Sequence, residues 1–336
     1  MLKDIKVSII IPNYNHALYF KQRIDSVLNQ TFQDFELIIL DDCSSDNSIE
    51  IIEQYSQNPK VSQIIFNQKN SGSVFKQWIK GIEQAKGEFI WIAESDDFAA
   101  EIFLQETIKV LKNDLSLGMV FTNTTNTDSL GEALTTSIEK NTTIFQKLKE
   151  FNNIIDHENT ALFLVSEMII ENASSVLFRK NNLLQVDFNQ LSQFKNTGDR
   201  FTYIGIALKS KILFLTEPLN FMRIHGDNTT KKNTENGQIH SDRVRVLNYY
   251  FENLVNSEYQ KEIADFYLSN YFYFINFCSY IENIELLKNI KRTNKISTVF
   301  YFMIYFYMYL FLYKKLKFRI FRSLYYRILV LQTKKN

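Results

Sequence analysis

The chain of 336 residues is long enough for one large domain or two smaller ones, and its 45% hydrophobic content with only 9 Gly and 3 Pro excludes a disordered protein. Its two cysteines, Cys43 and Cys278, give no support for a disulfide framework or a zinc site. The net charge of +1 is unevenly distributed, because twelve Lys and Arg residues and no acidic residue follow Glu285. The residues up to Glu285 therefore carry −11 and the tail carries +12, which predicts that body and tail face different surroundings.

Residues 7–125 alternate short apolar runs with helical periodicity. Buried strands are predicted at Ser8–Ile11, Phe35–Leu40, Gln63–Phe66, Glu88–Ala93 and Met119–Thr122. Crossover helices are predicted around Phe20–Leu28 and Phe75–Ile82, where apolar residues recur every three or four positions. This alternation is typical of βα units and predicts an α/β fold with a mostly parallel, Rossmann-like sheet flanked by helices.

The pattern weakens beyond Asn126, through a polar stretch that ends near Asn159. Two further strands are predicted at Val176–Lys180 and Lys211–Leu215, on either side of a helix. The aromatic-rich segment from about Ser241 to Asn283 lacks turn residues, which indicates a helical C-terminal region.

Two pairs of carboxylates directly follow predicted strands. Asp41 and Asp42 come after one strand, and Asp96 and Asp97 come after another. If the strands are parallel, both pairs lie at the edge of the sheet where ligands bind in open α/β folds. Neighbouring carboxylates repel each other, so we expect a hard cation, Mn²⁺ or Mg²⁺, or hydrogen-bond donors beside them. The alternative is that these residues only stabilise turns and helix ends, as we expect of Asp46.

These motifs, taken in order, resemble glycosyltransferase family 2, which has the A-type nucleotide-sugar fold. The resemblance covers about Val7 to Thr230. The matching segments are VSIIIPNYN (Val7–Asn15), Ser26–Ser48, NSGS (Asn70–Ser73) before Gly81–Asp97, NTGDR (Asn196–Arg200) and EPLNFMRIHGDNTT (Glu217–Thr230). The resemblance implies an inverting enzyme that transfers a sugar from a nucleotide diphosphate, a UDP-sugar, to a glycan or lipid-linked acceptor in cell-envelope polysaccharide synthesis.

The resemblance also implies a binding site for the nucleotide sugar. Asp42 would bind the uracil ring, Tyr14 would stack near the base, and Pro12 would shape that pocket. Arg223 and His225 would lie near the phosphates or over the donor. For His225 the alternative is a hydrogen-bonded structural residue.

Three carboxylates would carry the chemistry. The resemblance makes Asp97 the metal ligand, Asp96 a ribose contact or second metal ligand, and Asp199 the general base. One base without a carboxylate nucleophile predicts inversion at the anomeric carbon. For Asp199 the alternative is an N-cap of the following helix. The chain departs from the family at Glu94, where Asp is usual, and at Gly198, where Glu is usual.

Three other functions are alternatives, and each is disfavoured by a feature of the sequence. A nucleotidyltransferase would need a Gly-rich phosphate loop after the first strand, and IPNYNHALYF (Ile11–Phe20) has no glycine. A non-catalytic nucleotide-sugar-binding scaffold would not need the intact acidic residues. Nucleic-acid binding would interleave aromatic and basic residues, whereas the aromatic run of the tail is continuous, so we expect no nucleic-acid partner.

The tail is predicted to lie on a membrane surface. Ile296–Tyr313 is uncharged, flanked by Lys and Arg, and at about the shortest length that can span a bilayer, with Tyr distributed throughout. The segment after it has an apolar stripe and a basic stripe, as in an amphipathic helix on anionic lipid. Packing as core helices against Tyr267–Phe277 is the alternative. Because residues 1–6 are too short and polar for a signal peptide, we expect a cytoplasmic protein on the inner face of the membrane.

The domain organisation follows from these patterns. We expect a catalytic domain at residues 1–235, a helical extension at 236–295 and a membrane-associating tail at 296–336.

Overall fold

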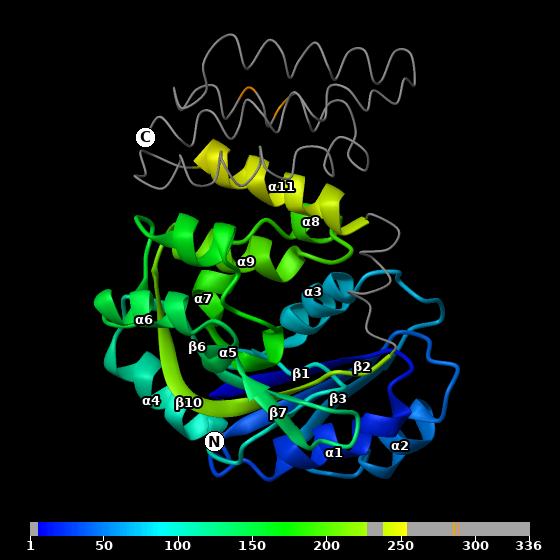
Figure 1. The fold of residues 1–336 in the computed structure, drawn as a ribbon. Helices are drawn as coiled ribbons and strands as arrows, with labels where there is room; N and C mark the ends of the chain where they lie inside the picture. Colours follow the sequence, from blue (N-terminus) through cyan, green and yellow to red (C-terminus); the bar gives the residue numbers. More distant parts are fainter. Residues whose placement is uncertain (1–5, 227–237, 254–284, 286–287, 289–336) are drawn as a thin grey trace, which may run out of the picture.

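The computed structural model describes residues 6–226 and 238–253, together with residues 285 and 288 (Figure 1). The first half of the described chain alternates strands and helices as predicted. Its elements are β1 (Val7–Asn13), α1 (Ala17–Leu28), β2 (Phe35–Asp41), α2 (Ser48–Gln54), β3 (Val61–Phe66), α3 (Val74–Gln84) and β4 (Phe89–Ile92). Each of the four strands predicted in this region is confirmed within two residues at either end.

The second half is less regular. Its elements are β5 (Phe98–Ala99), α4 (Phe103–Asn113), β6 (Leu117–Thr127), β7 (Ala133–Thr136), α5 (Ser137–Lys140), α6 (Thr142–Glu150), β8 (Ile154–Ile155), the π-helix η1 (Ala161–Ser166), the 3₁₀ helix η2 (Ala173–Ser175), β9 (Val176–Arg179), α7 (Lys180–Leu183), α8 (Phe188–Leu191), α9 (Gly198–Ala207), β10 (Lys211–Arg223) and α11 (Gln238–Asn253). The strands β6 and β10 extend far beyond the apolar runs that predicted them, because their later residues are polar and nonetheless paired in the sheet.

The described strands form one mixed sheet in the order β3-β2-β1-β4-β9-β6-β10-β5, with β7 beside β6 and β8 beside β10. The block from β3 to β4 is parallel, as predicted. The prediction of a mostly parallel sheet is confirmed, since β10 also pairs in parallel with β6. Among the described strands the exceptions are the short strands β5, β7 and β8 and, inside the sheet, β9, which runs antiparallel to both β4 and β6. A short apolar run that is buried on both faces carries no signal of strand direction, so the sequence could not reveal this reversal.

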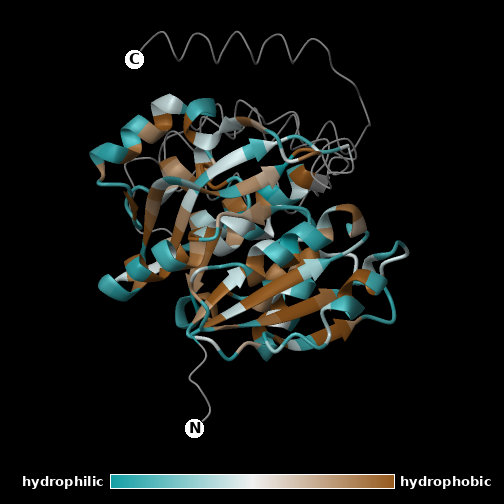
Figure 2. Ribbon diagram, turned by 90° about the horizontal axis from the view of Figure 1, so that it is seen from below, coloured by the Kyte–Doolittle hydropathy of each residue, from teal (hydrophilic) through white to brown (hydrophobic). Residues whose placement is uncertain are grey.

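Helices cover both faces of the sheet and create two cores. On one face, α1 and α4 pack residues such as Phe20 and Phe103 against the strands. On the other, α3, α9 and η1 contribute Phe75, Trp78 and Phe163. In the central strands, such as β1, β2, β4 and β9, alternate residues enter opposite cores, so these strands are hydrophobic along most of their length (Figure 2). Packing on both faces holds the strands in place, and with them the strand ends at which the polar loops begin.

The helix α11 packs on α9 at the end of the described structure, with the Tyr249 ring 4.5 Å from that of Phe201 (Figure 1). In the part of the chain that the structure describes, no helix is long and apolar enough to cross a membrane. The predicted tail at 296–336 lies outside the described residues, as does most of the predicted extension at 236–295 apart from α11.

Candidate active site

The polar loops after β1, β2 and β4 meet at one edge of the sheet, because these three strands are parallel neighbours. The Asn13 side chain donates to Asp41, and Asn15 both donates to Ser44 and accepts from Ser45. These bonds tie the loop after β1 to the loop after β2. The edge that the sequence predicted for both carboxylate pairs is therefore present, and β1 separates the two pairs.

The first pair is held by hydrogen-bond donors. Asp42 is 5% exposed and accepts bonds from the side chains of Asn67 and Gln77 and from the backbone and hydroxyl of Ser71. In the described structure, Asp41 and Asp42 belong to no set of side chains that could share a metal ion. Both carboxylates of this pair therefore have hydrogen-bond donors beside them, those of Asp41 being Asn13 and Ser44.

The residues predicted to surround a uracil ring lie beside this pair. Tyr14 immediately follows β1, and its residue is 47% exposed. Pro12 is buried inside β1, opposite Leu40 of β2. It therefore lies below the surface of the site, and its predicted influence on a pocket would be exerted through the chain that follows it.

The Asp97 carboxylate is buried and bonded to the protein on both oxygens. Oδ2 accepts from Asn172 Nδ2, Oδ1 accepts from the backbone N–H of Arg223 at 3.1 Å, and the buried Arg23 Nη2 lies 4.0 Å from Oδ2. Burial, followed by the neighbouring charge of Asp96, raises the pKa of Asp97 to about 7. This predicted metal ligand thus holds together loops that are far apart in the sequence.

Asp96 faces two imidazoles. His225 Nε2 lies 3.1 Å from Asp96 Oδ2, and His16 Nδ1 lies 2.8 Å from the Ser95 hydroxyl. Burial acts to raise the pKa of Asp96, but the hydrogen bond from His225 and the nearby His16 lower it below its usual value. Ligand atoms of His16, Asp96 and His225 lie within 4.8 Å of one another, as do those of Glu94, Asp96 and Asp97.

Both sets share Asp96 and fit a divalent ion. One offers a carboxylate and two imidazoles, and the other offers three carboxylates, so the donor chemistry matches Mn²⁺ and, for the second set, Mg²⁺. Imidazole and carboxylate oxygen together suit Mn²⁺ better than Mg²⁺, which prefers oxygen alone.

Arg223 is a structural tie in this arrangement. Its guanidinium donates to the Asp96 carbonyl at 3.0 Å and to Gln22 Oε1 at 2.6 Å, and its carbon Cζ lies 4.6 Å from the centre of the Tyr19 ring. All three guanidinium nitrogens thus bind protein atoms, the third donating to the carbonyl of Ser129, and the position of Arg223 near the donor stays a prediction.

Asp199 lies in the first turn of α9, partly buried, and Thr197 rather than Asp199 precedes that helix. Its Oδ1 accepts from the adjacent backbone N–H of Arg200, which is not the N-cap role given as the alternative. Burial raises the pKa of Asp199 to about 6. The pKa of Glu94 lies well above its usual value because of burial and then of the charges of Asp96, Asp97 and Asp199, so the four carboxyls share one region.

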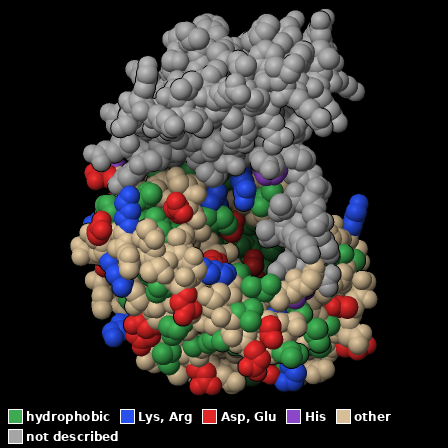
Figure 3. Space-filling model, in the orientation of Figure 1, with side chains coloured by type: hydrophobic (Ala, Val, Ile, Leu, Met, Phe, Trp, Pro, Cys, Tyr) green, Lys and Arg blue, Asp and Glu red, His purple; other side chains and the backbone are tan. Residues whose placement is uncertain are grey.

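The surface of the protein is hollowed near the middle of the face drawn in Figure 3, and acidic and basic side chains lie in and around this hollow.

The departure from the family at Gly198 has a packing cause. A Cβ at this position would lie 2.8 Å from the Phe75 ring and 2.9 Å from Leu191. The start of α9 is pressed so closely against α3 and α8 that only glycine fits without movement.

Sequence reasoning missed three residues of this site. His16 lies in the turn after β1, Arg23 is fully buried on α1 and donates to the Glu94 carbonyl, and Asn172 bonds Asp97. A signal for Arg23 existed, because it falls on the apolar face of α1 with Phe20 and Ile24, where an arginine needs a polar partner. Nothing in the sequence marks Asn172.

Comparisons with known proteins agree with this geometry. Residues 8–170 match the family model described as glycosyl transferase family 2. The chain is 27% identical over 298 residues to a chondroitin synthase of Pasteurella multocida. The matched region covers 85% of this chain and 27% of that protein. The chain spans less than half the length of the first curated relatives that it matches.

Two solved structures show the same fold. Staphylococcus aureus TarS residues 1–349 in complex with UDP match with a TM-score of 0.62 at 17% identity, over 90% of this chain and 86% of that one. The mannosyltransferase PcManGT from Pyrobaculum calidifontis, in complex with GDP-Man and Mn²⁺, matches with a TM-score of 0.57 at 14% identity, over 97% of this chain and 86% of that one. The predicted A-type glycosyltransferase fold is thus confirmed, and residues 8–170 match the model of glycosyl transferase family 2.

Proposed function

We propose that this chain is an inverting glycosyltransferase that takes a sugar from a UDP-sugar. The observation that carries the proposal is the meeting of Asp96, His16 and His225 at the carboxyl end of β4, in one acidic region with Asp199. Relatives support it, because solved structures of the same fold hold UDP, UDP-GlcNAc or GDP-Man with Mn²⁺.

Asp96, with His225 and His16, would hold the metal, and Asp97 stays a candidate ligand through its set with Glu94. When bound, Mn²⁺ or Mg²⁺ supplies a Lewis acid that neutralises the leaving diphosphate. Asp97 then keeps the Asp96 loop in place through its bonds to Asn172 and the Arg223 backbone.

The remaining steps belong to residues of the chain. Asp42 and Tyr14 would bind the uracil, with Asp42 exchanging a bond from its present donors for the ring N–H. Asp199 would accept the proton of the acceptor hydroxyl, and its pKa of about 6 leaves it charged at neutral pH and still basic enough to act. Because one base acts on one in-line attack, the anomeric configuration inverts.

We further propose a glycan or lipid-linked acceptor of the cell envelope, with the enzyme held on the cytoplasmic face of the membrane by its tail. The support comes from the sequence, in which twelve basic residues and no acidic ones follow Glu285.

The test is binding of UDP by the full chain, measured by calorimetry with and without Mn²⁺, followed by hydrolysis of UDP-sugars. Asp96→Ala is expected to remove the metal dependence of binding and at least about 10²-fold of the activity. Glu53→Ala, an exposed change on α2, serves as the matched control. Turnover that survives EDTA, or Asp96→Ala protein that matches the control, would refute the metal site.

A further inference from the structure

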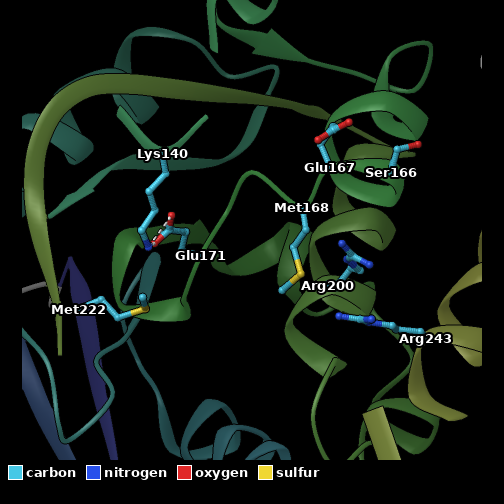
Figure 4. Close-up of a pocket in the computed structure, with 8 residues that line it drawn as sticks. All are labelled: Lys140, Ser166, Glu167, Met168, Glu171, Arg200, Met222 and Arg243. Carbon is cyan, nitrogen blue, oxygen red and sulfur yellow. Dashed lines mark hydrogen bonds and ion pairs between the residues drawn. The ribbon is translucent and has the colours of Figure 1, made fainter. Parts of the chain in front are cut away.

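A cavity of about 490 Å³ opens beside the proposed active site, and the proposed mechanism does not use it. Met222 and Arg200 both line it, and each is the immediate neighbour in sequence of a site residue, Arg223 and Asp199. Figure 4 shows Arg200 and Arg243 on one side of the cavity beside Met168, and Lys140 with Glu171 on the other.

The charges on the two sides differ in their partners. Lys140 Nζ lies 3.1 Å from Glu171 Oε2, so that pair is internally neutral. In contrast, neither Arg200 nor Arg243 takes part in any salt bridge among the residues described, and the Nε atoms of both are buried without a hydrogen-bond partner. Arg200 is only 7% exposed.

This arrangement is unfavourable in the absence of an anion. Burial, and then the positive charge of Arg243, lower the pKa of Arg200 to about 10, so this guanidinium remains charged at neutral pH, as arginine does in proteins generally. Buried charges in folded proteins are normally paired or hydrogen-bonded. Asp199 offsets part of the charge of Arg200, yet two guanidinium groups that line one cavity outside any described salt bridge, each with an unsatisfied Nε, indicate a missing anionic ligand.

We propose that Arg200 and Arg243 bind an anionic group of the acceptor, a phosphate or a carboxylate, that neighbours the hydroxyl to be glycosylated. This rests on the proposed function, in which Asp199 accepts the proton of that hydroxyl. A guanidinium group binds such an oxyanion through two parallel N–H···O bonds. These bonds would give the Nε atoms of Arg200 and Arg243 the hydrogen-bond acceptors that they lack. The acceptor is then an anionic glycan or a phosphate-linked chain.

The test titrates the full chain with inorganic phosphate and, separately, with glucuronate, at constant ionic strength. The donor site is first filled with UDP and Mg²⁺, so that phosphate cannot bind there. We expect Arg243→Gln to weaken anion binding about tenfold or more, as for the loss of a charge-assisted bond. Arg245→Gln, on the same helix and directed at Asp242 and the Gln193 carbonyl, is expected to change it less than twofold.

Arg200→Lys, checked by circular dichroism, gives a second variant that keeps the charge and loses the fork, and it is also expected to weaken binding. Stronger binding of phosphate supports a phosphate-bearing acceptor, and stronger binding of glucuronate supports an acidic sugar. Equal affinities of the Arg243→Gln and Arg245→Gln proteins, or no binding of either anion to the native chain, overturn the proposal. A native chain that binds no UDP refutes the proposed donor and not the anion site. The anion affinities of the Arg243→Gln and Arg245→Gln proteins can then still be compared without UDP, because any other anion site is the same in both.

Discussion

Replacing Asp199 by Asn is expected to stabilise the folded protein while it removes sugar transfer. Burial raises the pKa of Asp199 from 3.8 to about 6, so the charged carboxylate is less favourable in the folded than in the unfolded chain. This difference in pKa between the unfolded and the folded chain corresponds to about 3 kcal/mol. Because the residue is partly exposed, solvent screening reduces the expected gain to about 1–3 kcal/mol.

The sign depends on pH. Between about pH 4 and 6 the folded state binds more protons at Asp199 than the unfolded state does. The free energy of unfolding of the native protein therefore falls as the pH rises through this window. The Asn variant lacks that slope. Its advantage in the free energy of unfolding should therefore be near zero at pH 4 and complete above about pH 7.

Urea unfolding of both proteins at several pH values between 4 and 8 measures this difference. The exposed change Glu53→Gln provides the control for loss of one negative charge. Transfer should fall by about 10²-fold or more, with UDP binding retained, because only the proton acceptor is lost. An Asn variant that is less stable than the native chain at pH 8, or that transfers sugar at close to the native rate, would contradict the reasoning from burial.

Three other changes test the structure around the site. Gly198→Ala should lower the free energy of unfolding in urea by about 1–3 kcal/mol because its Cβ would collide with two neighbouring side chains, whereas Gly226→Ala, with open space around it, should change it little. Arg23→Met should cost about 3–5 kcal/mol by leaving Asp97 without its buried counter-charge, and adding Asp97→Asn should recover part of that loss; a double variant no more stable than the single one would exclude the pairing. Removing residues 284–336 should abolish sedimentation with anionic-lipid vesicles at low salt and spare UDP binding, so equal sedimentation of both chains would refute a membrane-binding tail.

The parallel half of the sheet could be predicted because each of its strands is a continuous apolar run followed by turn residues. The polar ends of β6 and β10 could not, since strands such as Asn123–Thr127 carry no hydrophobic pattern and are held by pairing with a distant segment. The reversal at β9 was hidden for a different reason: its apolar run predicts a strand, but the direction of that strand depends on the connection and not on composition.

The site residues were found by motif, and their contacts were not. Asp96 and His225 were both predicted near the donor, yet their separation by 129 positions conceals that they touch. The resemblance implied similar roles for the adjacent Asp96 and Asp97, whereas their partners differ in the structure. Asp96 faces two histidines, and Asp97 accepts bonds from Asn172 and from the Arg223 backbone. Such a division depends on which side of a loop each side chain leaves, which no local pattern encodes.

The tie between α1 and Arg223 has a consequence for how the protein is made. Gln22 and Arg223 are 201 positions apart, and Arg23 reaches Ser174 across 151 positions. Contacts of such high sequence separation form slowly and late, after the loops between them have closed. On the ribosome, α1 emerges long before β10 exists, so the first sheet strands can pair while the acidic loop after β4 still lacks its last partners. The segment that matches the family model ends before Asn172, so a fragment limited to it lacks the residues that hold Asp97 in place.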